Sequence, residues 1–232
     1  MHSLTRYYKK NAKDENELDN RLIYKTAIIT LNGQGNSGKS TVAEELTNSG
    51  LGIAGYTYEE RDLFVNTFYR HLSRSDIQRN AEVYGIPSLA WIALKYHSQM
   101  KPLLADGKVL ILDHYLGDYY ADMLPDLKEL SHFEKVVRCL KLPFFTVGTH
   151  FYFDINYETY LQRRTSREHS TLFAQEISDA NSVPLKLFVE RKQRYLKLVD
   201  MGYLIKIDAN TSIKCVLDAV KKHIHKRETD AD

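Results

Sequence analysis

Cysteine and long apolar runs are scarce in this 232-residue sequence. Its two cysteines, Cys139 and Cys215, stand in separate segments without the spacing of a metal-binding pair, which predicts buried free thiols in a reducing compartment. No apolar run approaches the ~18 residues that cross a membrane, and the first residues lack the apolar core of a signal peptide. We therefore expect a cytoplasmic protein that does not contact a membrane.

An excess of charge of either sign is also absent. Lysine plus arginine number 32 and aspartate plus glutamate number 30, which leaves a net charge of +2. This balance argues against a surface that coats nucleic acid polymers or seeks anionic membranes, so any anion site has to be local. The nine histidines show no spacing typical of a metal site, and we predict no transition metal held by protein ligands.

One glycine-rich stretch, residues 33–40 with the sequence GQGNSGKS, fits the pattern G-x-x-x-x-G-K-[ST]. An apolar run at 26–31 predicts a strand before it, and residues 42–46 favour a helix after it, which is the context that this motif requires. Glycines let the loop turn its N–H groups towards a phosphate, and the helix N-terminus adds further donors. The pattern predicts a nucleoside triphosphate site; a glycine-rich turn without a ligand is the alternative.

Within this stretch the polar residues have distinct expected roles. The Lys39 ammonium is expected to reach the β- and γ-phosphates, and the Ser40 hydroxyl to bind Mg²⁺. The residues assigned to ATP binding are Gly33, Asn36, Ser37, Gly38, Lys39, Ser40 and Thr41.

Strands and helices alternate along the rest of the chain, which predicts an α/β fold with a parallel sheet covered on both faces. Residues 1–24 are polar and are expected to form a mobile arm, residues 25–225 one domain, and residues 226–232 a tail. Pro102 is expected to kink a helix in its last turn. Further strands are predicted at 53–58, 108–113, 149–155 and 203–208, and helices at 63–72, 89–104, 119–130, 133–140, 158–167, 185–199 and 212–225.

The apolar strand at 108–113 ends in Asp113. An apolar strand that ends in a carboxylate downstream of a phosphate-binding loop has the form of a Walker B element, whose aspartate helps to hold Mg²⁺. A plain aspartate at a strand end is the alternative. We assign Asp113, with Ser40, to the metal.

Arg163, Arg164 and Arg167 stand at the entrance to residues 166–184, where helical periodicity fails. Three guanidinium groups beside a mobile lid, at about 163–184, can hold phosphate oxygens in bidentate pairs and neutralise charge during phosphoryl transfer. A solvated basic face of a helix is the alternative.

Glu59, Glu60 and Arg61 follow the strand predicted at 53–58, at the edge of a parallel sheet where ligands bind. One carboxylate is suited to take a proton from an acceptor or to bind a sugar hydroxyl, while Arg61 holds a phosphate. A charged first turn of a helix explains the cluster equally well, and both interpretations stay open.

Several stretches resemble the thymidylate kinase branch of the P-loop nucleoside monophosphate kinases. Residues 101–115 (KPLLADGKVLILDHY) resemble its helix, turn and strand ending in Asp-Arg-Tyr. Residues 151–167 resemble its fourth strand and the opening of its lid, and residues 188–196 the helix after the lid. Residues 207–209 (Ile-Asp-Ala) resemble the end of its last strand, near the adenine.

The resemblance implies a three-layer P-loop NTPase fold with a five-stranded parallel sheet and a lid. It implies an ATP-dependent kinase that uses Mg-ATP as donor and a deoxynucleoside monophosphate as acceptor; a homodimer is one arrangement left open. By the same likeness Lys39 and Ser40 serve the triphosphate and the metal, Asp113 the metal shell, Arg163, Arg164 and Arg167 the lid contacts, and Ala209 the adenine.

On the acceptor side the chain differs from that family. Gly35 stands where members commonly carry a carboxylate, and His114 replaces the arginine of Asp-Arg-Tyr. Trp91 with Lys95 is the nearest match to the aromatic and arginine that hold the base and its phosphate, although Trp91 equally suits a core position. The residues assigned to the acceptor are Glu59, Glu60, Arg61, Trp91, Lys95, His114 and Tyr115.

Three functions stay open at this point. The first is phosphate transfer from Mg-ATP to a nucleoside monophosphate or related acceptor. The second is transfer to a nucleoside or another small hydroxyl compound, with Glu59 or Glu60 as general base. The third is of another class, an ATP-binding regulatory or interaction protein that phosphorylates no acceptor.

Overall fold

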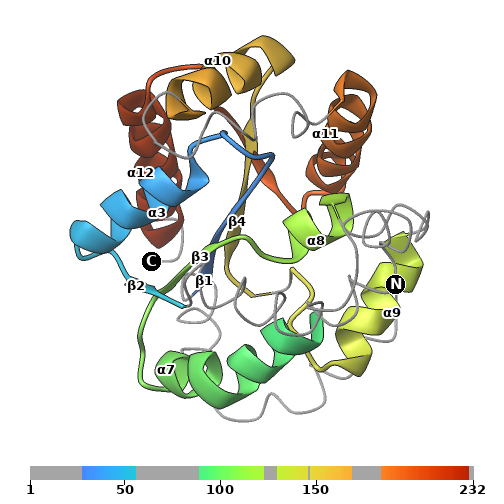
Figure 1. Cartoon of the computed structure of the whole chain (residues 1–232). Coiled ribbons are helices and arrows are strands. Elements are labelled where there is room, and N and C mark those ends of the chain that lie inside the picture. Colours follow the sequence, from blue (N-terminus) through green and yellow to red (C-terminus); the bar gives the residue numbers. More distant parts are fainter. Residues whose placement is uncertain (1–27, 56–88, 123–129, 146, 169–183, 230–232) are drawn as a thin grey trace.

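The computed structural model describes residues 28–55, 89–122, 130–145, 147–168 and 184–229 (Figure 1). A five-stranded sheet runs through its centre in the order β2-β3-β1-β4-β5, and every neighbouring pair of strands is parallel. The predicted α/β class and parallel sheet are confirmed. The arm predicted at 1–24 and the helix predicted at 63–72 lie outside the described residues.

The central strand is β1 (Ile28–Asn32), between β3 (Leu110–Asp113) and β4 (Thr149–Asp154). The edge strands are β2 (Ile53–Ala54) and β5 (Ile205–Asp208). Leu31 of β1 is level with Asp113, and Asn32 with Tyr152 of β4. The carboxyl ends of the three inner strands therefore lie side by side along one edge of the sheet, perpendicular to the edge strands. Residues 33–38 leave β1 at this edge.

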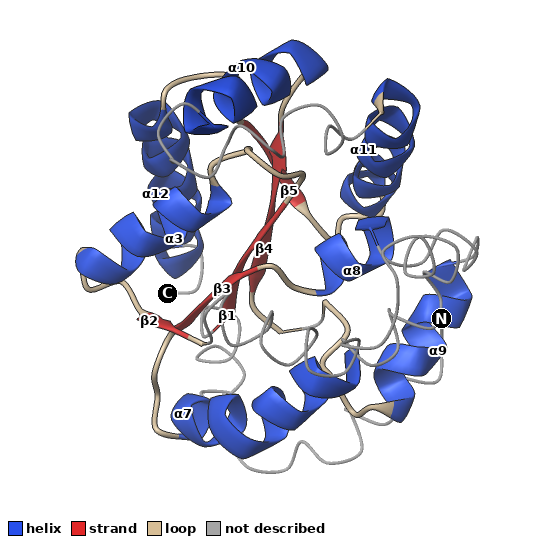
Figure 2. Cartoon of the chain, in the orientation of Figure 1, coloured by secondary structure: helices blue, strands red, loops and turns tan. Residues whose placement is uncertain are grey.

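Helices occupy the connections between the strands (Figure 2). One helical stretch begins at 89 and runs through a π-helical turn, η1 (Tyr96–Met100), into α7 (Lys101–Ala105). The π-helical turn lies just before Pro102, which stands in the first turn of α7 and cannot donate an i→i−4 hydrogen bond. The kink predicted at Pro102 stays a prediction. The other helices are α3 (Lys39–Asn48), α8 (Leu116–Asp122), α9 (Leu130–Cys139), α10 (Tyr157–Glu168), α11 (Leu185–Asp200) and α12 (Ile213–Thr229).

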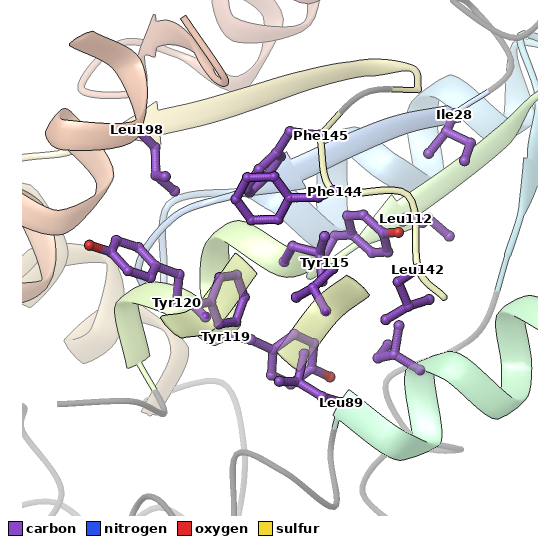
Figure 3. Packing of buried hydrophobic residues seen from close by; sticks show 14 of the residues in the cluster. Ile28, Leu89, Leu112, Tyr115, Tyr119, Tyr120, Leu142, Phe144, Phe145 and Leu198 are labelled. Atoms are coloured by element: carbon purple, nitrogen blue, oxygen red, sulfur yellow. The ribbon is translucent and has the colours of Figure 1, made fainter. Parts of the chain in front are cut away.

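Alternate residues of the strands pack into two different cores. Ile28, Leu110 and Leu112 belong to an aromatic-rich core with the helices at 89–105, α8 and α9 (Figure 3). Ile29 and Ile111 belong to a second core with α3, α10 and α12. Because successive side chains of a strand point to opposite faces, the sheet is a middle layer between two helical layers, as predicted.

Several predicted details are wrong. Helix α8 begins at Leu116 rather than at 119, and α12 continues to Thr229 through part of the predicted tail, whose Lys, Arg and Glu residues favour helix. Both cysteines are free but exposed, not buried. The buried stripe of α9 follows Leu130, Phe133 and Val137, and Cys139 lies off that stripe. Within the described residues, no helix combines the length and the apolarity that a membrane span needs.

Candidate functional site

The glycine loop (residues 33–38) joins the end of β1 to the first turn of α3. Gly33, Asn36 and Gly38 hold positive φ angles of 147°, 59° and 92°. A Cβ atom on Gly33 would lie 2.8 Å from the carbonyl oxygen of Phe153, and one on Gly38 would lie 2.7 Å from Ile213 Cδ1. Gly33 is therefore required both by its backbone angle and by the backbone packed against it, whereas Gly38 is required by its backbone angle, because Ile213 Cδ1 is the end of a flexible side chain.

Lys39 is the first residue of α3, and only 4% of it is exposed. Its Nζ atom donates hydrogen bonds to the carbonyl oxygens of Gly33, at 2.5 Å, and Gln34, at 3.1 Å. The ammonium therefore lies folded over the loop backbone. A buried positive charge at a glycine-rich loop is what an anion with several oxygens would pair with.

The next residues of the loop region point to the same kind of ligand. Ser40 and Thr41 are exposed in the first turn of α3, and the N-cap residue Gly38 has no side chain with which to cap the helix. Ser37 is buried, and its hydroxyl makes no hydrogen bond within the described residues. The N-terminus of a ten-residue helix carries partial positive charge, so this end of α3 favours an anion.

Asp113 ends β3, next to the end of β1. It is partly buried, and its Oδ1 atom has no hydrogen-bond partner within the described residues. A carboxylate oxygen without a donor and the Ser40 hydroxyl are hard oxygen ligands of the kind that Mg²⁺ prefers, with water and phosphate completing its shell. Among the residues described, no group of three or more His, Cys, Asp and Glu side chains is suited to hold a metal alone. The residues present fit Mg²⁺ bound together with a phosphate ligand.

Asp118, in the first turn of α8, is a buried carboxylate beneath the glycine loop, only 4% exposed. Its Oδ1 atom accepts hydrogen bonds from the N–H of Gly33 at 2.7 Å and from the hydroxyl of Tyr195 at 2.6 Å. His114 Nδ1 lies 3.0 Å from Oδ2, which forms an ion pair when the imidazole is protonated. Burial by itself would raise the pKa of Asp118, but the charges of His114 and Lys39 and the N–H of Gly33 hold it below its usual value.

The lowered pKa of Asp118 predicts how stability depends on pH. An ionised Asp118 stabilises the fold above the unfolded-state pKa of about 4, and this contribution is lost as pH falls through the lower pKa of the folded state. Below about pH 4, the wild-type protein should therefore lose free energy of unfolding faster than the Asp118→Asn variant. Urea unfolding of both proteins at a series of pH values tests this. Parallel stability curves would show that Asp118 has the same pKa in both states.

Arg163 of α10 contacts the glycine loop. Its Nη1 atom donates to the carbonyl oxygens of Asn36 and Ser37, both at 3.3 Å, and Nη2 to Thr211 at 2.9 Å. The guanidinium therefore contacts loop backbone, and its partial burial lowers its pKa. Arg164 is partly buried on the same helix. The backbone of Arg167 belongs to α10, but its side chain and lid residues 169–183 lie outside the described part of the chain.

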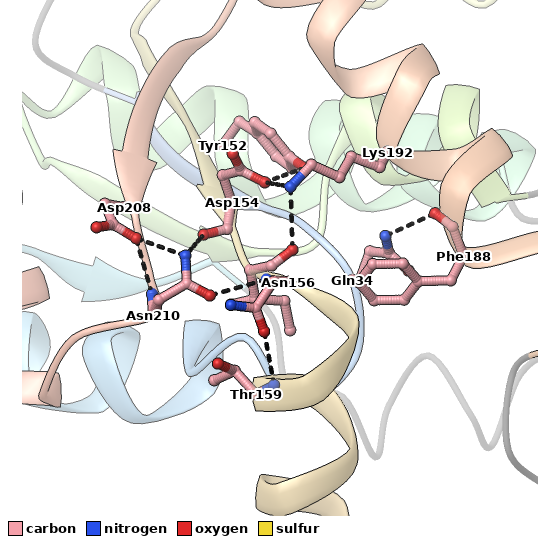
Figure 4. Close-up of polar contacts among 10 residues, drawn as sticks. Gln34, Tyr152, Asp154, Asn156, Thr159, Phe188, Lys192, Asp208 and Asn210 are labelled. Carbon is pink, nitrogen blue, oxygen red and sulfur yellow. Dashed lines mark hydrogen bonds and ion pairs between the residues drawn. The ribbon is translucent and has the colours of Figure 1, made fainter. Parts of the chain in front are cut away.

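The segment after β5 is tied to the end of β4 (Figure 4). The N–H of the buried Ala209 donates to the carbonyl oxygen of Asp154 at 2.9 Å, and Asn210 bonds to Asp208, to Asp154 and to the N–H of Asn156. Lys192 of α11 forms a 2.5 Å ion pair with Asp154. These contacts hold Ala209 at the sheet edge that also carries the glycine loop.

The residues predicted to bind the acceptor differ in their burial, and some lie outside the described residues. His114 follows β3 with φ 76° and is partly exposed, beside Asp113. Tyr115 is buried, and burial raises its pKa. Trp91 lies in the aromatic-rich core, with Lys95 Nζ 5.8 Å from its ring centroid, which favours the core interpretation of Trp91. The residues Glu59, Glu60 and Arg61 are not among those that the structure describes.

Asp118 and Tyr195 are the site residues that sequence reasoning missed. Asp118 interrupts an otherwise apolar stretch, Leu116 to Tyr120, and a charge at such a position is a signal for a buried, partnered carboxylate. Tyr195 lies in a helix of mixed charge and carries no such signal. No family model matches the sequence, and a comparison with curated proteins found no match. The geometry of the glycine loop and its surroundings is therefore the guide to function.

Proposed function

We propose that this chain is an ATP-dependent kinase with a P-loop, which transfers the γ-phosphate of Mg-ATP to a nucleoside monophosphate or a related acceptor. The observation that carries the proposal is the glycine loop with the buried ammonium of Lys39 folded over it at the N-terminus of α3. Two required glycines, a helix end without a side-chain cap and a nearby carboxylate all suit a polyphosphate with its metal.

Four residues at the loop have separate roles in the proposed reaction. Lys39 Nζ exchanges its carbonyl partners for the β- and γ-phosphate oxygens and neutralises their charge. Ser40 and Asp113 are suited to hold Mg²⁺, which supplies further charge neutralisation when it is bound. Arg163 keeps the loop in place through its carbonyl contacts.

The bond changes follow from in-line transfer. An acceptor oxygen forms a bond to the γ-phosphorus, the bond from that phosphorus to the β,γ-bridging oxygen breaks, and ADP leaves. The protein contributes alignment and charge rather than a covalent intermediate. The lid predicted at 163–184 would exclude water from this step, and this part of the proposal rests on the sequence.

A second acceptor class is favoured by His114. A phosphate-bearing acceptor is held best by an arginine, which stays charged at every relevant pH, whereas histidine is charged only when protonated. At this position the imidazole is already engaged by Asp118. A nucleoside or another small hydroxyl compound, which needs no cation for a second phosphate, is therefore the second candidate acceptor.

The test is ADP production from Mg-ATP by the purified protein. Nucleoside monophosphates, nucleosides and a sample without acceptor form the panel, and EDTA forms the metal-free control. We expect one monophosphate to raise ADP formation at least about tenfold above the no-acceptor rate. Stronger stimulation by a nucleoside would move the second candidate ahead. An ATP-binding protein with no acceptor dependence would contradict the kinase proposal and favour a regulatory role.

A further inference from the structure

The buried pair of Asp118 and Tyr195 is joined to the glycine loop through the N–H of Gly33. We propose that these two are positioning residues: the Tyr195 hydroxyl fixes the Asp118 carboxylate, which fixes Gly33 and, through it, the resting place of the Lys39 ammonium. This inference rests on the proposed function of the loop in phosphate transfer. It gives α8 and α11 a role in positioning the loop, which the loop motif itself does not predict.

Gly33 is the link between the pair and Lys39. Its N–H donates to Asp118 Oδ1 at 2.7 Å, and its carbonyl oxygen accepts from Lys39 Nζ. A hydrogen bond to a carboxylate is about twice as strong as one between neutral groups, so Asp118 is the firmest anchor that this N–H can have. A shift of the carboxylate therefore moves Gly33 and, with it, the oxygen on which the ammonium rests.

Tyr195 is held rigidly enough to fix the carboxylate. It is fully buried in α11, and its ring stacks on that of Tyr152 of β4, with centroids 4.7 Å apart and planes at 12°. Its hydroxyl lies 2.6 Å from Asp118 Oδ1, the same oxygen that accepts the N–H of Gly33. The hydroxyl thus sets the position of the oxygen atom that accepts the N–H of Gly33.

A second contact joins α11 to the next residue of the loop. Gln34 Nε2 donates to the carbonyl oxygen of Phe188 at 2.9 Å, where Phe188 lies in the first turn of α11 (Figure 4). Arg194 of α11 also donates to the carbonyl oxygen of Ala121 in α8 at 3.0 Å. The first two loop residues, α8 and α11 therefore form one connected unit, so the placement of α11 and of the loop are coupled.

The experiment compares Tyr195→Phe with Tyr152→Phe. Each substitution removes one hydroxyl from the same ring stack, but the Tyr152 hydroxyl donates to Asp154 rather than to Asp118. For Tyr195→Phe we expect kcat to fall about tenfold while KM for ATP stays within about threefold, because a small displacement of the reacting groups costs rate more than binding. For Tyr152→Phe we expect kcat within about twofold of wild type.

Two results would overturn the inference. If both variants lose kcat to the same extent, the ring stack matters and the contact with Asp118 does not. An unchanged kcat in Tyr195→Phe would show that the hydroxyl positions nothing of consequence.

A readout independent of turnover separates this inference from the proposed function. Amide hydrogen exchange of Gly33 in the ligand-free protein should be faster in Tyr195→Phe than in Tyr152→Phe or wild type. If the wild-type protein neither transfers phosphate nor binds magnesium tripolyphosphate, the proposed function fails. In that case, faster exchange in Tyr195→Phe alone still supports the anchoring of Gly33, and equal exchange in both variants overturns it.

Discussion

Replacing Lys39 by methionine is expected to lower kcat/KM for phosphoryl transfer at least about a hundredfold, or about 2.7 kcal/mol of transition-state stabilisation. The ammonium lies against the glycine loop, bonded to the carbonyl oxygens of Gly33 and Gln34, where it would pair with a bound triphosphate in the proposed reaction. Methionine keeps most of the buried alkyl chain and removes only the charge. Initial rates of ADP formation with the best acceptor measure the effect.

The matched control is Lys108→Met, which removes one exposed positive charge just before β3, at the opposite edge of the sheet from the glycine loop. Its rate should stay within about twofold of wild type. Lys39→Met should still fold, with a somewhat lower free energy of unfolding than wild type, because the buried Asp118 carboxylate loses one of the positive charges that stabilise it. Full activity in a folded Lys39→Met protein would rule out the proposed phosphate site.

Gly33→Ala is expected to lower the free energy of unfolding by about 2–4 kcal/mol. Gly33 has φ 147°, which an alanine adopts only with strain, and the added Cβ would lie 2.8 Å from the carbonyl oxygen of Phe153. Because that oxygen belongs to the backbone of β4, it cannot move aside as a flexible side chain would. Urea unfolding monitored by circular dichroism measures the loss.

Two other glycines separate the causes of this effect. Gly107 has φ 73°, but no atom of the described residues outside its chain neighbours lies within 4 Å of the position that an added Cβ would take, so Gly107→Ala should cost only the backbone strain, about 1 kcal/mol. Gly35 lies in the same loop, without the strained φ, and its nearest contact is Tyr160 at 4.0 Å, so Gly35→Ala should change stability by less than about 1 kcal/mol. If Gly33→Ala lowers the free energy of unfolding no more than Gly107→Ala does, the loop does not approach β4 as closely as the structure shows.

Arg163 has contacts that its sequence position did not suggest. Its guanidinium donates to the carbonyl oxygens of Asn36, Ser37 and Thr211, and the phosphate contact expected at the entrance to a lid stays a prediction. These contacts join the glycine loop to the segment that follows β5. Under the proposed function, the glycine loop would hold the phosphates and the segment after β5 would hold the base. The Arg163 side chain contacts both.

Local patterns in the sequence were enough to predict the framework of the site. The apolar run before residue 33, the glycines and the helix-favouring residues after Lys39 act over a few positions, and they predicted β1, the loop and α3. The same holds for β3 ending in Asp113 and for α10, whose residues follow helical periodicity. Periodicity and turn chemistry are properties of neighbouring residues, so a sequence read in order contains them.

The tertiary structure alone decided which distant residues meet. Tyr195 and Asp118 are 77 residues apart, and their contact depends on α11 packing against α8 at the end of the sheet. The burial of Trp91, the exposure of both cysteines and the carbonyl contacts of Arg163 likewise depend on which helix covers which face. The sequence determined a parallel α/β fold and its glycine loop because those follow from local periodicity. The anchoring of the loop came only from the packing of segments whose relative placement no local pattern encodes.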